Sequence, residues 1–102
     1  MPIELTSSQR TRLRSLARRL EPAMAVGKAG VDAGALGHVR RWLERQELLK
    51  IRLLPAAGAD RKVLAEALAQ AAEAALVDVV GRVVVLYRPR PGLPAHRRVQ
   101  LP

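Results

Sequence analysis

The sequence predicts a single α/β domain in which helices pack on a four-stranded mixed sheet. The chain has 102 residues, of which 49% are hydrophobic, so it can bury one modest core. Apolar residues recur with helical spacing in some segments and show the alternation or β-branched composition of strands in others. Glycines and prolines separate these segments, which follow the order α-β-α-β-α-β-β.

The first helix is expected to begin near Ser7 and to end at Pro22, which lacks an amide hydrogen. Thr6 and Gln9 have the spacing of a capping box, in which both side chains satisfy free backbone groups. The apolar stripe of this helix consists of Leu13, Leu16, Ala17 and Leu20. Residues 23–26 are short and apolar, which favours a buried strand.

A second helix is expected from an N-cap at Asp32 to about Gln46. Its inner face is marked by Leu36, Val39 and Leu43. Residues 48–54 then alternate apolar and charged side chains, as in a strand with one buried face. The charged face of this strand carries Lys50 and Arg52.

After a connection over residues 55–59, Asp60 suits the N-cap of a third helix. The apolar stripe expected for this helix consists of Leu64, Ala67, Leu68, Ala71 and Ala75. Two β-branched runs, residues 77–80 and 83–87, flank Gly81-Arg82, which predicts a hairpin. Strand–helix–strand units should give parallel neighbours and the hairpin an antiparallel pair, so the sheet is expected to be mixed.

The composition changes after Pro89. Residues 90–102 are rich in proline and arginine, and we expect an extended, partly mobile tail there. We therefore divide the chain into a domain over residues 1–89 and a basic tail over residues 90–102.

The charge of the chain points to a polyanionic partner. Eighteen basic residues oppose nine acidic ones, giving a net charge of +9. Residues 1–54 hold eleven basic and five acidic residues, and residues 82–102 hold five arginines and no acid. Residues 55–81 are mildly acidic. Such a balance could also serve solubility or reflect a GC-rich genome, but fifteen arginines against three lysines suit forked contacts to phosphate.

Several other classes of function are not expected. The chain has no cysteine, its histidines are far apart in the sequence, and all its hydroxyl side chains from serine and threonine lie between Thr6 and Ser15. We therefore expect no metal, no cofactor and no enzymatic activity. No apolar run approaches the roughly 20 residues that span a bilayer, and the first residues lack an export signal. We expect a cytoplasmic monomer that does not contact membranes.

One local motif has a ligand-binding mechanism, the GxxG loop formed by Gly27, Lys28, Ala29 and Gly30. Two glycines permit positive φ angles and expose amide donors, Lys28 adds a charge, and the dipole of the following helix adds positive potential. A GxxG pair alone often marks only a turn. Here it stands between a strand and a capped helix in a basic chain, and the GxxG loop of KH domains clamps nucleic-acid backbone.

Outward-facing cations extend the candidate phosphate-binding surface. They are Arg14, Arg18, Arg41, Arg45, Lys50 and Arg52. Each alone is typical of a solvated face, but together, with few acids, they favour tracking of phosphates with a steep salt dependence. Trp42 and Tyr87 are the only aromatic residues, so base stacking should be minor, and a structural role is favoured for both.

Four runs of residues together point to a known family. They are Leu5-Thr6 with the first helix, Gly27-Lys28-Ala29-Gly30-Val31, Glu47-Leu48-Leu49-Lys50-Ile51 and Val85-Leu86-Tyr87-Arg88-Pro89. These runs resemble the CRM domain, named for chloroplast RNA splicing and ribosome maturation, in its stand-alone bacterial YhbY-like form. The similarity extends to about Pro89, and the GxxG position together with the final Leu-Tyr-Arg-Pro is fairly specific.

The resemblance implies a fold similar to the C-terminal domain of bacterial translation initiation factor three. It also implies RNA binding and a role in ribosome maturation, with 23S rRNA in pre-50S particles as the partner. The GxxG loop matches the RNA-contacting loop of the family, whereas neither Trp42 nor the tail inherits a role. Two alternatives share the positive charge: a general DNA-binding protein, and a module that docks an acidic protein.

Overall fold

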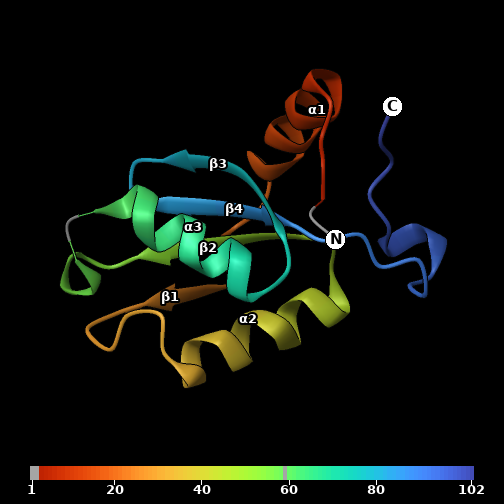
Figure 1. The fold of residues 1–102 in the computed structure, drawn as a ribbon. Coiled ribbons are helices and arrows are strands. Elements are labelled where there is room, and N and C mark those ends of the chain that lie inside the picture. The colour runs from red at the N-terminus through yellow and green to blue at the C-terminus, as the bar shows by residue number, and fades with distance from the viewer. Residues whose placement is uncertain (1–2, 59) are drawn as a thin grey trace.

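The structure is a computed structural model, and it describes residues 3–58 and 60–102. It confirms the predicted α/β class and the order of elements (Figure 1). Two short 3-10 helices, Pro55–Ala57 and Ala95–Arg97, lie outside the predicted elements. Residue 59 of the expected connection lies outside the described residues. The main elements are α1 (Ser7–Ala17), β1 (Met24–Val26), α2 (Ala33–Arg45), β2 (Leu48–Leu53), α3 (Arg61–Ala71), β3 (Ala75–Val80) and β4 (Val83–Tyr87).

The helix starts follow the caps expected from the sequence. Thr6 and Gln9 form the reciprocal capping box of α1. Asp32 accepts a hydrogen bond from the Ala35 amide at α2, and Asp60 accepts one from an amide in the first turn of α3. These contacts are local, which is why the residue pattern predicts them.

The end of the first helix differs from expectation. α1 stops at Ala17 instead of continuing to Pro22, because the chain turns at Arg18, and the amide of Leu20 bonds back to the carbonyl of Ala17. Lys50 Nζ also donates to the carbonyl of Leu20, just beyond this turn, at 3.0 Å.

The four strands have the order β1-β2-β4-β3 (Figure 1). β1 and β2 are parallel neighbours, whereas β4 is antiparallel to both β2 and β3. The expectation of parallel neighbours is therefore correct for β1 and β2 but wrong for β2 and β3. Four of the five residues of β4 are buried, so this strand takes a central position, and β3, which ends at the exposed Val80, takes the edge.

Helices cover both faces of the sheet. α2 and α3 pack on one face around the buried Leu49, Ile51 and Leu86. α1 packs on the other face, over Leu48 and Tyr87. β2 was expected to bury only one face, but Leu48 is buried beneath α1, and only Lys50 and Arg52 leave the core on that side.

α3 is rotated from its predicted orientation. Its deepest residues are Ala65, Leu68 and Ala69, followed by Ala72 beyond its end. Only Leu68 of the expected stripe is fully buried, and Ala75 belongs to β3 rather than to this helix. The many alanines of the segment give almost the same apolar contrast at neighbouring rotations, so packing against the sheet selects the buried face.

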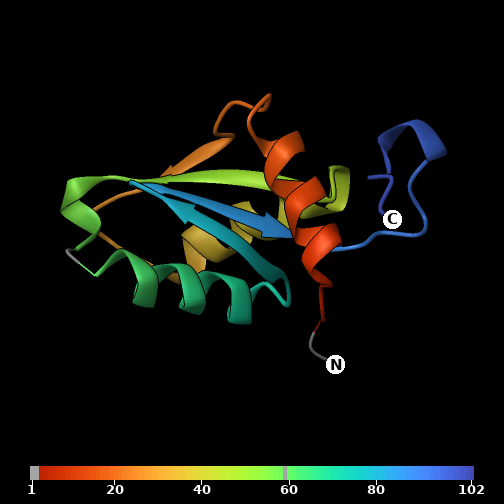
Figure 2. The ribbon, with the colours of Figure 1, turned by 90° about the horizontal axis from the view of Figure 1, so that it is seen from above.

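The C-terminal segment folds back onto the domain, so the expectation of an extended tail is wrong. The buried carboxylate of Glu47 accepts hydrogen bonds from the amides of Arg90 (2.5 Å) and Val99 (2.6 Å). Arg98 Nε lies 3.4 Å from the same carboxylate. Val99 and Leu101 pack against the buried cluster between α1 and the sheet. Figure 2 shows the C-terminal segment beside this helix.

No helix in the described part of the chain is both long enough and apolar enough to cross a membrane.

Replacing Glu47 with alanine should destabilise the fold, because it leaves the amides of Arg90 and Val99 without their buried acceptor. We expect the free energy of unfolding to fall by about 2–4 kcal/mol in urea denaturation. Glu44→Ala, on the exposed side of α2, is the matched control and should change it by less than about 0.5 kcal/mol. Equal losses in the two variants would contradict the anchoring role of Glu47.

Tyr87 can report directly on the charge of the buried Glu47, since it is the only tyrosine of the chain. Burial raises the pKa of Tyr87, the charge of Glu47 raises it further, and Arg98 opposes the shift. The folded protein therefore holds the phenol proton more tightly than the unfolded chain, so this contribution to stability should be lost as the pH rises above about 10. In an absorbance titration of tyrosinate, Glu47→Gln should lower the pKa; an unchanged value would exclude the influence of Glu47.

Candidate nucleic-acid interface

The GxxG loop lies on the surface between the edge strand β1 and α2. The amide of Gly30 donates to the carbonyl of Gly27 at 2.8 Å and closes a tight turn. Gly30 has a φ of +67°, whereas Gly27 does not adopt a positive φ. The expectation that both glycines use left-handed backbone is therefore correct only for Gly30.

Two amides of this loop remain available for a ligand. Those of Gly30 and Asp32 are used within the turn, but those of Lys28 and Ala29 make no hydrogen bond to the described residues. Both side chains are exposed, and a Cβ added at Gly30 would have no neighbour within 4 Å. The outer side of the loop is thus open and presents two amides beside an ammonium group.

The N-terminus of α2 adds less positive potential than its dipole alone would supply. Asp32 Oδ1 accepts the amide of Ala35 at 2.8 Å, which consumes one donor and places a carboxylate next to the loop. The ammonium of Lys28 and the loop amides are therefore the main positive groups at this point.

Three of the predicted cations meet in one hollow of about 340 Å³ between α1 and the sheet, which we call the α1–sheet hollow. Arg14 and Arg18 enter it from α1 and Lys50 from β2. Arg14 Nε lies 3.6 Å from a carboxylate oxygen of Asp78, so its charge is partly offset. No salt bridge in the described part of the chain involves Arg18.

Arg52 continues this row of cations toward the GxxG loop. It follows Lys50 on the same face of β2, is exposed, and pairs in register with Ala25 of β1. One residue further along, Val26 pairs with β2, and Gly27 begins the loop. The parallel pairing of β1 and β2 therefore joins the α1–sheet hollow to the loop.

Arg41 and Arg45 lie apart from this row. Both are exposed on α2, which covers the opposite face of the sheet from α1. A Cβ added at Gly37 would lie 3.7 Å from a terminal nitrogen of Arg41, so that side chain extends back along α2 toward the loop. Arg45 lies in the last turn of α2, at the end of the helix away from the loop.

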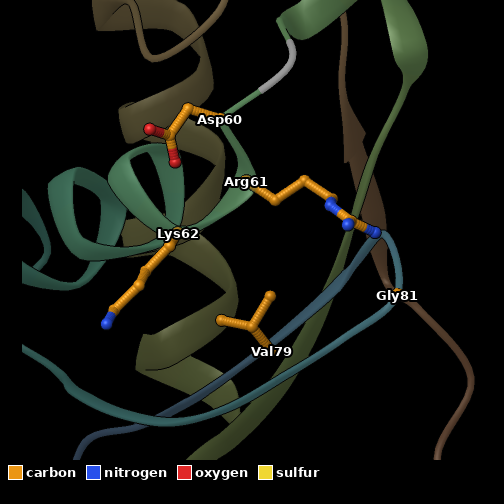
Figure 3. A pocket seen from close by; sticks show the side chains of 5 residues that line it. All are labelled: Asp60, Arg61, Lys62, Val79 and Gly81. Carbon is orange, nitrogen blue, oxygen red and sulfur yellow. The ribbon is translucent and has the colours of Figure 1, made fainter.

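Sequence reasoning missed two cations at the loop end of the sheet. β1, β2 and β3 run in one direction, so the GxxG loop and the start of α3 lie at the same end (Figure 1). Arg61 and Lys62 line a hollow of about 490 Å³ there, and Arg61 extends toward the turn at Gly81 (Figure 3). The net acidity of residues 55–81 concealed this basic pair.

Other arginines are committed to the fold. Arg10 donates to the carbonyls of Leu76 and Val77, and Arg82 donates to those of Leu53, Leu54 and Gly58. These bonds fasten α1 to β3, and the hairpin turn to the end of β2. A count of net charge does not distinguish such structural arginines from those that face solvent.

Comparison with known proteins gives consistent results. The model of the CRS1/YhbY (CRM) domain matches residues 5–88. The Bacillus subtilis "Probable RNA-binding protein YqeI" is 37% identical over 84 residues, covering 82% of this chain and 88% of YqeI. An "RNA-binding protein" of Haemophilus influenzae is 33% identical over 101 residues, covering 96% of this chain and 95% of the relative.

A solved structure shares the fold. It is the solution structure of the hypothetical protein SAV1595 from Staphylococcus aureus, described as a candidate RNA-binding protein. The TM-score is 0.80 at 34% identity, and the match covers 97% of this chain and 100% of the other. The family model and these relatives together show that the chain belongs to the CRS1/YhbY (CRM) domain family.

Proposed function

We propose that this protein binds structured RNA through its backbone phosphates and assists maturation of the large ribosomal subunit. Its partner is 23S rRNA in pre-50S particles, which it binds in the cytoplasm as a monomer and without catalysis. The observation that carries this proposal is the open GxxG loop at the end of a row of cations, with Lys28 and two amides that make no hydrogen bond within the described part of the chain. Family membership and the names of the relatives support RNA as the polyanion.

The arrangement of donors suits phosphate better than bases. Amides of Lys28 and Ala29 can donate to a non-bridging oxygen, and the row through Arg52 to the α1–sheet hollow can follow the backbone beyond it. Specificity then comes from the shape of the folded RNA, because phosphate contacts by themselves carry no sequence information.

The aromatic residues support the same conclusion. Trp42 is half-buried and packs against the core beneath α2 and α3. Tyr87 is buried beneath α1. Proteins that bind single strands stack successive bases on exposed aromatic rings, and neither ring here is free to do so on the sheet. Contacts to phosphates are therefore the main source of affinity.

A competition assay tests the choice of nucleic acid. Labelled 23S rRNA fragments, bound on filters at physiological salt, should be displaced by unlabelled rRNA but poorly by duplex DNA. Sedimentation of cell extract should place the protein with pre-50S particles, and ribonuclease should release it. A preference for DNA would support a general DNA-binding protein instead, and association that resists ribonuclease would support docking on an acidic protein.

Gly30→Asp should weaken RNA binding by more than about tenfold, because it places a carboxylate on the open side of the loop. Gly81→Asp is a matched control: its φ is +57°, close to the +67° of Gly30, and an added Cβ meets nothing within 4 Å at either position. Both variants should lose about 1 kcal/mol of stability from left-handed strain.

Fluorescence anisotropy with an rRNA fragment measures the affinity of each variant, and thermal denaturation measures its stability. Gly30→Asp should lose far more affinity than Gly81→Asp, whose carboxylate lies in the hollow beside Arg61 and not on the GxxG loop. An equal loss of affinity in the two variants would show that the GxxG loop has no special part in binding.

A further inference from the structure

A second hollow lies on the other flank of α1, between this helix and the C-terminal segment. We call it the α1–tail groove; its volume is about 440 Å³, within the range of roughly 300–1,000 Å³ typical of ligand clefts. α1 therefore forms a wall shared by the α1–sheet hollow and the α1–tail groove. Figures 1 and 2 both show the C-terminal segment running beside α1.

The floor of the groove is apolar. It is formed by Leu16 and Leu20 from the α1 side, Leu48 from β2 and Val99 from the C-terminal segment. Leu48 is buried, whereas 36% of Leu20 is exposed, which makes it one of the few large apolar side chains open to solvent. An apolar body placed on this floor would remove that surface from water.

The rim of the groove is positively charged. Arg12, Arg19 and Arg97 line it, all three are exposed, and none forms a salt bridge with any residue that the structure describes. The carboxylate of Glu47, at the bottom, is fully used by two amides and Arg98. An anion at the rim therefore meets guanidinium groups without an exposed opposing carboxylate.

We propose that the α1–tail groove binds an unpaired nucleotide, with the base on the apolar floor and the adjoining phosphates on Arg12, Arg19 and Arg97. This inference rests on the RNA-binding function proposed above. A nucleotide within a strand joins a flat, uncharged base to anionic groups on either side, which matches an apolar floor between cations. The Nε2 of Gln46 donates to the Leu48 carbonyl, so its amide oxygen is left to accept from a base.

The position of the groove predicts which RNA is bound best. The α1–sheet hollow and the GxxG loop lie on one side of α1, and the groove lies on the other. A duplex on the first side and an unpaired strand in the groove would place α1 at their junction. The protein should therefore prefer a helix that ends in unpaired nucleotides to the same helix with a blunt end.

The test uses a fluorescent RNA hairpin in three forms: blunt, with a short unpaired uridine extension, and with the same extension made abasic. The full chain should bind the uridine form about tenfold more tightly than the blunt form. The abasic form keeps the phosphates but lacks the bases, so it should lose most of this gain. If the abasic form binds as tightly as the uridine form, the groove does not hold a base and the inference is wrong.

Two matched double variants locate the effect. Arg12→Ala with Arg19→Ala should abolish the gain from the uridine extension. Arg61→Ala with Lys62→Ala removes the same charge at the start of α3 and should leave the gain intact. A gain that survives in the first pair would overturn the inference.

A third variant tests the floor. Leu20 is exposed enough for Leu20→Ala to leave the fold intact, and this change should reduce binding of the uridine form by about threefold without affecting the blunt form. Absence of all RNA binding would refute the proposed function itself. Tight binding of the blunt form with no gain from the extension would overturn only the groove inference, and competition by an acidic, leucine-containing peptide would then indicate a protein ligand.

Discussion

The antiparallel pairing of β2 with β4 holds the rest of the molecule in place. It sets Leu48 opposite Tyr87 and Lys50 opposite Val85. The buried cluster beneath α1 and the α1–sheet hollow therefore lie on the same face of the sheet. Beyond Tyr87 the pairing continues as a bond from the Arg88 amide to the carbonyl of Glu47. The C-terminal segment therefore begins beside the buried carboxylate that holds it.

The cations of this chain form two groups, structural and solvent-facing, which a count of net charge does not distinguish. Arg10 and Arg82 donate to main-chain carbonyls at strand ends and hold elements together. Arg18, Lys28 and Arg52 face solvent along the row that reaches the GxxG loop. The proposed binding surface therefore depends on the structural group, because displacement of α1 or of the hairpin turn would separate the members of the row.

The tail has a different position in the molecule from the one its composition suggested. Prolines and arginines outnumber apolar residues there, yet Val99 and Leu101 pack against the core beneath α1, and Glu47 supplies acceptors for two amides. These few contacts convert the segment into one wall of a groove, which brings Arg97 to the rim opposite Arg12 and Arg19. The basic residues of the tail thus add to the surface of the domain.

What the sequence by itself determined is local: the helix caps at Thr6, Asp32 and Asp60, the turn at Gly81, and the GxxG loop between a strand and a helix. Each of these features depends on residues only a few positions apart, so a short stretch of sequence includes all the interacting groups. The position of β4 between β2 and β3, the rotation of α3 and the anchoring of the tail were decided only in the tertiary structure. So was the separation of Arg41 and Arg45 from the other predicted cations. These outcomes depend on which apolar surfaces exclude water together and on contacts as distant as that between Glu47 and Val99, which no short window of residues records.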